Sequence, residues 1–263
     1  MYDYIKQGDC LELMKEIPDK SIDFILCDLP YGTTQNNWDC EIPLDLLWAQ
    51  YKRIIKDNGA IALFAQCPFD KVLGASNLKM LKYEWIIEKT RATGHLNANI
   101  APMKAHENVL IFSNGTPPYN PQKTTGHKPI NAYTKHKSDK GVYGETKLNI
   151  KGGGNTTRYP RDVIKFKWDT RKSSLHTAQK PIALLEYLIR TYTKEGDIVF
   201  DSCMGSGSTC VAAINTDRHY IGYEINEEFF EMAGNRIQEA IKDNSIRQLS
   251  LTDNLQEKTN ESI

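Results

Sequence analysis

Apolar residues along the chain fall into short continuous runs and longer stretches of helical period, and the two kinds alternate. "SIDFILCD" (21–28) and "AIALFAQ" (60–66) predict buried strands. "PLDLLWAQYKRIIKDNG" (43–59) has apolar residues at i, i+3 and i+4, which predicts a helix closed by Gly59. Strands that alternate with helices indicate an α/β fold with a parallel, doubly wound sheet.

The same alternation extends over the first and last thirds of the chain. Further strands are expected at 3–9, 83–90, 107–114, 197–202 and 219–226. Further helices are expected at 10–18, 69–81, 180–196, 209–217 and 227–243. We therefore expect one α/β domain formed by 1–114 and 173–242, followed by a flexible polar tail at 243–263.

The pattern breaks between residues 115 and 172, which are rich in Gly, Pro, Asn, Thr and Lys and show no clean period. We interpret this segment as a loop-rich insert. Although the whole chain has a formal net charge of zero, Tyr119 to Lys172 contains 13 Lys+Arg against 4 Asp+Glu, and so carries +9. A basic segment within an otherwise acidic protein indicates either a polyanionic partner or a solvated loop face.

Composition excludes several classes of protein. No run approaches the length of a membrane span, and the first residues lack a signal-peptide pattern. The six cysteines form no CxxC pair, so neither a zinc site nor a disulfide framework is expected. Several cysteines lie in apolar runs, which is typical of buried thiols in a reducing cytoplasm.

A strand, a glycine loop and a helix follow one another in "VFDSCMGSGSTCVAA" (199–213). Glycines let the backbone approach a ligand closely, and a helix N-terminus offers free N–H groups. Glu224 ends the next strand, 17 residues after Gly207, where a carboxylate can accept hydrogen bonds from both ribose hydroxyls. Together these features predict a cofactor that contains a nucleoside.

The details of the loop narrow the choice of cofactor. The dinucleotide fingerprint requires a third glycine where Cys210 stands, and the chain has no GxxxxGK[ST] sequence for a P-loop. The loop begins with the acid Asp201, which suits a ligand with a positive centre better than a pyrophosphate. S-adenosylmethionine, with its sulfonium and ammonium groups, is the cofactor that we predict.

Several motifs together resemble one enzyme family. "DLPY" (28–31) resembles a D-P-P-Y motif, "FDSCMGSGST" (200–209) a cofactor motif, and "HTAQKP" (176–181) the motif that precedes it. The catalytic motif lies about 170 residues before the cofactor motif, a permuted order that resembles the β class of DNA amino-methyltransferases. "HENVLIFS" (106–113) and residues 8–28 fit the same pattern, so the resemblance covers roughly 4–114 and 173–240.

The resemblance implies a Rossmann-like methyltransferase fold with circularly permuted motifs, and an insert at 115–172 that recognises the DNA target. It also implies roles for three residues. Because a base within a duplex is out of reach, it must be flipped out. Tyr31 would stack on the flipped base, while Asp28 and the Pro30 carbonyl would accept its amino hydrogens. Gly32 would permit a sharp exit from this turn.

Asp28, where cytosine-N4 enzymes of the family more often have serine, favours adenine N6 as the methylated atom over cytosine N4. The chain departs from the family pattern at Leu29, where proline is more usual; we expect altered rigidity and retained chemistry.

The resemblance further implies a set of cofactor-binding residues and a set of partners. The cofactor set is Asp9, Thr177, Gln179, Lys180, Asp201, Gly205, Ser206, Gly207 and Glu224. Asp9 has a second reading as a helix N-cap, and Lys180 as a surface cation that contacts a phosphate. The expected partner is double-stranded DNA, with a second copy of the chain and a cognate restriction endonuclease as possible additions. No metal is expected.

Three other classes of protein fit these motifs less well. Protein-glutamine and RNA methyltransferases share a similar motif but place the glycine loop before it. A cytosine-C5 enzyme requires a nucleophilic cysteine, typically after proline, and none of the 11 prolines is followed by cysteine. A DNA-binding module without catalysis would not need to retain the acids, the tyrosine and the glycines together.

Overall fold

The computed structural model describes residues 2–31, 42–135, 149–167 and 179–260, and side chains as far as residue 247. The strands are β1 (Tyr4–Gln7), β2 (Ile22–Asp28), β3 (Ile55–Ala65), β4 (Leu81–Thr93), β5 (Lys104–Phe112), β6 (Tyr133–Lys135), β7 (Ile150–Gly152), β8 (Val163–Phe166), β9 (Ile198–Asp201) and β10 (His219–Glu224). The α-helices are α1 (Cys10–Leu13), α2 (Leu44–Ile54), α3 (Phe69–Ser76), α4 (Ile182–Tyr192), α5 (Ser208–Asn215) and α6 (Glu227–Asn260). Two short 3-10 helices are η1 (Met14–Glu16) and η2 (His95–Asn97).

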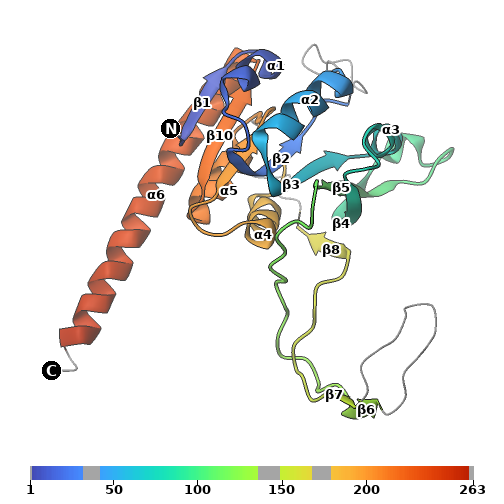
Figure 1. Ribbon diagram of the computed structural model, residues 1–263, viewed down its shortest axis with the longest axis vertical. Coiled ribbons are helices and arrows are strands. Elements are labelled where there is room, and N and C mark those ends of the chain that lie inside the picture. Colours follow the sequence, from blue (N-terminus) through green and yellow to red (C-terminus); the bar gives the residue numbers. More distant parts are fainter. Residues whose placement is uncertain (1, 32–41, 136–148, 168–178, 261–263) are drawn as a thin grey trace. The chain divides into compact units, whose positions relative to one another are not determined.

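Eight strands form one sheet in the order β1-β10-β9-β2-β3-β5-β4-β8 (Figure 1). The sheet is mostly parallel, as predicted, but β5 departs from the prediction because it is antiparallel to both of its neighbours, β3 and β4. The remaining pairs in this sheet are parallel. A single hairpin connection between β4 and β5 reverses the chain direction there, whereas parallel neighbours need a longer crossover.

Alternate residues of the strands face two separate apolar cores. Phe24 and Leu26 of β2 pack with α4, α5 and α6 on one face of the sheet. Ile25 and Cys27 pack with α1 and α2 on the other face. Both faces are covered, as expected for near-continuous apolar strands in an α/β fold. None of the helices in the described ranges has the length and apolar character needed to cross a bilayer.

The predicted helix over 43–59 is too long at its C-terminal end. Helix α2 stops at Ile54, and β3 begins at Ile55, which pairs with Ile22 of β2. Gly59 therefore lies in a strand and is not a helix cap. A Cβ at Gly59 would lie 2.9 Å from the Asp23 carbonyl oxygen, so the close passage of β2 explains this glycine.

Other boundaries also differ from the prediction. Helix α3 ends at Ser76, well short of residue 81, and α6 continues to Asn260, past residue 242 where we expected a tail to begin. Strand β8 lies in the segment interpreted as an insert, yet it pairs with β4 at the edge of the sheet.

The chain separates into two compact units, 121–161 and the remainder. Within the smaller unit, β6 and β7 form an antiparallel pair. A backbone bridge between Thr124 and Arg158 ties the outer segments together. The Arg158 guanidinium donates to the Lys128 carbonyl at 2.6 Å, and the Lys123 ammonium lies 4.2 Å from the Tyr159 ring centre.

Candidate active site

Three acids come together because each stands at the carboxyl end of a parallel strand, and these strand ends lie side by side. Asp28 ends β2, Asp201 ends β9 and Glu224 ends β10, and these strands are neighbours in the order β10-β9-β2. From β9 the chain winds to one side, and from β2 to the other. Ligands of open α/β sheets bind at this type of switch point.

The glycine loop connects β9 to α5 in backbone conformations that favour glycine. Gly205 has φ +51° and Gly207 has φ +77°. A Cβ on Gly207 would approach the Ala233 Cβ of α6 to 2.9 Å, whereas a Cβ on Gly205 would meet none of the described residues within 4 Å. Gly207 is therefore required by helix packing, and Gly205 borders open space in which a ligand can lie.

Glu224 and Asp201 are buried and hold the loop by accepting backbone hydrogen bonds. Glu224 accepts from the Gly205 N–H at 2.8 Å and from the Asn226 N–H at 2.8 Å. Asp201 accepts from the Cys203 N–H at 3.0 Å. Burial raises the pKa of Asp201 to about 6 despite this bond and one from Thr209, and burial also raises the pKa of Glu224 against its amide bonds.

These two carboxylates fit a cofactor with a positive centre and a ribose. Burial disfavours their charged forms, and a cation nearby would offset that cost. Each Glu224 oxygen accepts one backbone amide, which leaves a further lone pair on each for a hydroxyl donor. No group of His, Cys, Asp and Glu within the described ranges is arranged to hold a metal ion.

Asp28 accepts hydrogen bonds from two side chains of its own chain. The Tyr31 hydroxyl donates to Asp28 Oδ1 at 2.7 Å, and Lys180 Nζ donates to Asp28 Oδ2. Burial first, and then the negative charge of Asp28, raise the pKa of Tyr31 well above its ordinary value, so Tyr31 remains a neutral donor. Its ring lies 5.0 Å from that of Phe69, tilted by 31°.

Lys180 also joins the half-buried Asp28 to a buried acid, Glu107. Lys180 Nζ lies 3.5 Å from Glu107 Oε2. Glu107 Oε1 is bound by Lys89 Nζ at 2.6 Å and by the Gln66 amide at 2.8 Å. Burial opposes the charge on Glu107, but Lys180 and Lys89 outweigh it and lower the pKa of Glu107. Burial likewise opposes the charge on Lys180, and the two carboxylates reverse this and raise its pKa.

Glu107 is a site residue that sequence reasoning did not identify, although it lies in a motif quoted for the resemblance. It reaches the active edge because β5 is antiparallel to β3: Asn108, the next residue, pairs with Ala65 at the carboxyl end of β3. In a parallel β5 it would lie at the opposite edge. An acid two residues before the apolar run "VLIF" (109–112) was the available signal.

The remaining predicted residues are placed as follows. Asp9 caps α1 by accepting from the N–H groups of Leu11 and Glu12, the N-cap geometry of its second reading. Ser206 is buried and accepts from Arg236 at 2.7 Å. Pro30 and Gln179 are half-buried. Gly32 and Thr177 lie outside the described residues.

Leu29, the departure from the family motif, is 3% exposed and packs in the core beneath α1 and α2. Its side chain therefore points away from the ligand side, which explains how leucine can stand at this position.

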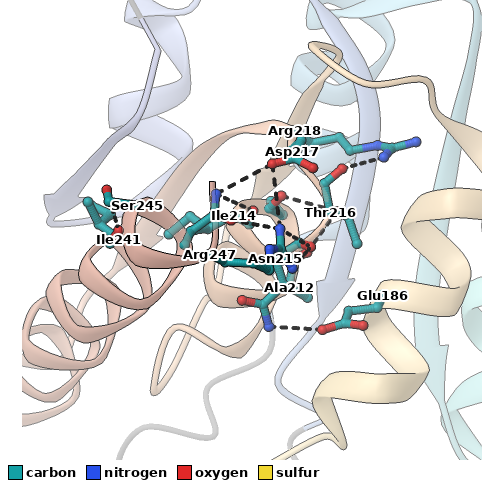
Figure 2. A network of polar contacts seen from close by, with 12 residues as sticks. Glu186, Ala212, Ile214, Asn215, Thr216, Asp217, Arg218, Ile241, Ser245 and Arg247 are labelled. Atoms are coloured by element: carbon teal, nitrogen blue, oxygen red, sulfur yellow. Dashed lines mark hydrogen bonds and ion pairs between the residues drawn. The ribbon is translucent and has the colours of Figure 1, made fainter. Parts of the chain in front are cut away.

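An open pocket with a volume of about 890 Å³ lies beside the amino ends of β9 and β10, at the opposite end of these strands from the three acids. Two of its arginines are engaged by neighbouring groups. Arg218 donates to the Thr193 carbonyl at 3.0 Å. Arg247 pairs with Asp217 at 3.7 Å and donates to the Asn215 carbonyl (Figure 2). These contacts hold α4, α5 and α6 together, so we assign this surface to packing and not to the reaction.

Comparison with known proteins gives consistent matches. A family model described as DNA methylase matches residues 22–235. The DNA adenine methyltransferase YhdJ of Escherichia coli (strain K12) is 28% identical over 251 residues, which cover 89% of this chain and 82% of YhdJ.

Two solved structures share the fold. That of the M1.HpyAVI–SAM complex aligns with a TM-score of 0.60 at 23% identity, over 89% of this chain and 98% of that one. That of the cytosine-N4-specific PvuII DNA methyltransferase aligns with a TM-score of 0.65 at 17% identity, over 95% and 93%.

Proposed function

Because this chain belongs to the N6/N4 DNA methylase family and depends on S-adenosylmethionine, we propose that it methylates the N6 amino group of a flipped adenine in duplex DNA. The observation that carries the proposal is the position of Asp28. Its carboxylate stands at the same edge of the sheet as the glycine loop, on the strand adjacent to β9. A base held by Asp28 would lie beside a cofactor held by Asp201 and Glu224.

The bound cofactor would supply an electrophilic methyl group. The part played by the chain is to hold the amino nitrogen in position. Asp28 would accept one amino N–H and the Pro30 carbonyl the other, which draws the nitrogen lone pair out of conjugation with the ring. Tyr31 would support the base by stacking. Catalysis then rests on positioning and electrostatics, with no covalent intermediate on the protein.

The choice of adenine rests on Asp28, where the family's cytosine-N4 enzymes more often have serine, and is supported by the name of the relative YhdJ. Cytosine N4 is the second candidate, favoured by the fold shared with a cytosine-N4-specific enzyme. A protein-glutamine or RNA substrate is a weaker third candidate.

We keep the proposed cofactor role for the residues predicted from the sequence, except that Lys180 is assigned a different position. Asp201, Glu224 and the loop from Gly205 to Gly207 would bind the cofactor directly. Lys180, which binds Asp28 and Glu107, would act between the catalytic and cofactor positions. The basic unit at 121–161 would contact the DNA, and the activity would be cytoplasmic.

The test is to incubate the purified protein with S-adenosylmethionine and unmethylated duplex DNA, digest the DNA to nucleosides, and identify the product by mass spectrometry. N6-methyladenine is the expected product. N4-methylcytosine would overturn the choice of base and leave the mechanism of amino-group capture in place. Neither product, with cofactor binding intact, would refute a DNA substrate and favour a protein or RNA.

A further inference from the structure

Both carboxylate oxygens of Asp28 already accept hydrogen bonds from the protein, which conflicts with its proposed role of accepting an N–H from the substrate base. Tyr31 occupies Oδ1 and Lys180 occupies Oδ2. A carboxylate oxygen in a charge-assisted bond to an ammonium is a weaker acceptor for a neutral amino group. For Asp28 to accept the amino N–H strongly, and so localise the lone pair on the substrate nitrogen, its strongest partner, Lys180, must release it.

Glu107 offers Lys180 a second position. Its Oε2 is buried and has no hydrogen-bond partner among the described residues, while Lys180 Nζ stands 3.5 Å away. A buried carboxylate oxygen without a hydrogen bond is costly, so this acceptor favours a donor. A movement of under about 1 Å would bring the ammonium within hydrogen-bond distance.

We propose that Glu107 is a positioning residue that receives the Lys180 ammonium when the substrate amino group binds at Asp28 Oδ2. The proposal rests on the proposed function of Asp28. Lys180 exchanges one carboxylate for the other and keeps an ion pair throughout, so the release of Asp28 requires no uncompensated buried charge.

The surroundings of Lys180 suit such an exchange. Its Nζ lies 5.0 Å from the Phe64 ring centre, and an aromatic face attracts a cation without fixing it to one direction. Glu107 is held in place from the other side by Lys89 and Gln66, both on Oε1, so Oε2 stays directed to Lys180. Lys180 is the part that moves and Glu107 is the fixed receiver.

The test compares Glu107→Gln with the matched control Glu88→Gln, which removes an exposed carboxylate that pairs with Lys165. The main measurement is the single-turnover rate at which a tritiated methyl group is transferred to unmethylated plasmid DNA. The dissociation constant for S-adenosylmethionine and the melting temperature are measured as well. Glu107→Gln should slow transfer about 10- to 100-fold, because Lys180 then stays on Asp28. Cofactor affinity should stay within about twofold, and the control should match the wild type in all three measurements.

A double variant separates positioning from simple structural support. If Glu107 acts by withdrawing Lys180, then Glu107→Gln combined with Lys180→Gln should transfer methyl groups faster than Glu107→Gln alone, because Asp28 is freed. A double variant as slow as Glu107→Gln, or slower, overturns the proposal. A wild type that methylates no DNA would instead remove the proposed function, and this inference with it.

A second measurement uses the wild type and so does not depend on the folding of any variant. The protein is crystallised with S-adenosylhomocysteine and a duplex that it methylates. Lys180 Nζ bound to Glu107 Oε2, with the target amino group on Asp28, supports the proposal; Lys180 still on Asp28 overturns it.

Discussion

Tyr31 combines two properties that substitution can separate: a hydroxyl that donates to Asp28 and a ring proposed to stack on the base. Tyr31→Phe removes only the hydrogen bond and should slow transfer about 3- to 10-fold. Tyr31→Ala removes both and should weaken DNA capture further, visible as a higher KM for DNA. Cofactor affinity, measured by calorimetry, should be unchanged in both variants.

The variant Asp28→Ala is the comparison for the two Tyr31 variants. Asp28→Ala should abolish transfer while the protein still binds S-adenosylmethionine. An equal loss of cofactor affinity in Asp28→Ala and Tyr31→Ala would contradict the roles assigned to both residues.

Asp201 links pH to stability and to cofactor binding. Its folded pKa of about 6 lies above the ordinary value of 3.8, so the folded state binds more protons than the unfolded state between these values. The contribution of Asp201 to stability is therefore most favourable below pH 4 and is lost as the pH rises through 6. Asp201→Asn should stabilise the ligand-free protein by up to about 3 kcal/mol at pH 8 and by less at pH 5.

The same substitution should weaken S-adenosylmethionine binding at pH 8, because the ionised carboxylate that would face the positive cofactor is gone. Denaturant unfolding and calorimetry at the two pH values check both effects. A variant that loses stability at pH 8 would show that the hydrogen bonds of Asp201 outweigh the cost of its burial.

At the scale of elements, the glycine loop is constrained by the packing of α5 against α6 at Gly207. Gly207→Ala adds a Cβ at a positive φ and 2.9 Å from the Ala233 Cβ. Gly196→Ala is a matched control, since Gly196 has φ +80° but a Cβ there would meet nothing within 4 Å. Gly196→Ala should cost about 1 kcal/mol of unfolding free energy.

Gly207→Ala should cost more than its control and should also weaken cofactor binding, because the loop must move away from α6. Melting temperature and cofactor affinity are the two measurements. Equal effects of the two substitutions would mean that α6 adapts to the added methyl group.

Elements whose signal is local could be predicted from the sequence. The apolar run of β2, the glycine loop after β9 and the acids Asp28 and Glu224 could all be recognised there. The end of α2 could not, because a chain that passes from helix to strand at Ile54–Ile55 has no punctuating residue there. Strand direction also escaped prediction, since a buried strand has the same pattern in either direction, and the position of Glu107 depends on it.

At the scale of the whole molecule, the charge is divided between the two compact units. Residues 121–161 contain nine Lys+Arg and two Asp+Glu, a net charge of +7 in a chain that is neutral overall. Lys128 and Lys151 are exposed on this unit, whereas Arg158 is engaged with backbone carbonyls. We therefore expect the lysines to contact phosphates and Arg158 to hold the unit together.

Lys128→Gln and Lys151→Gln should each reduce the slope of log affinity for DNA against log salt by about 0.9. Lys242→Gln, an exposed change on α6, is the control and should leave the slope unchanged. The slopes are measured by fluorescence anisotropy over a salt series. An effect of Lys242→Gln equal to that of the other two would place the DNA elsewhere.

The pairing of β1 with β10 has a consequence for the order in which the sheet can assemble during synthesis. Tyr4 to Gln7 find their partners at Ile221 to Glu224, more than 200 residues later in the chain. Contacts between such distant segments close a large loop and form slowly. During synthesis β1 cannot join the sheet until β10 has also been made, so the pairing of these two strands is a late step in the assembly of the sheet.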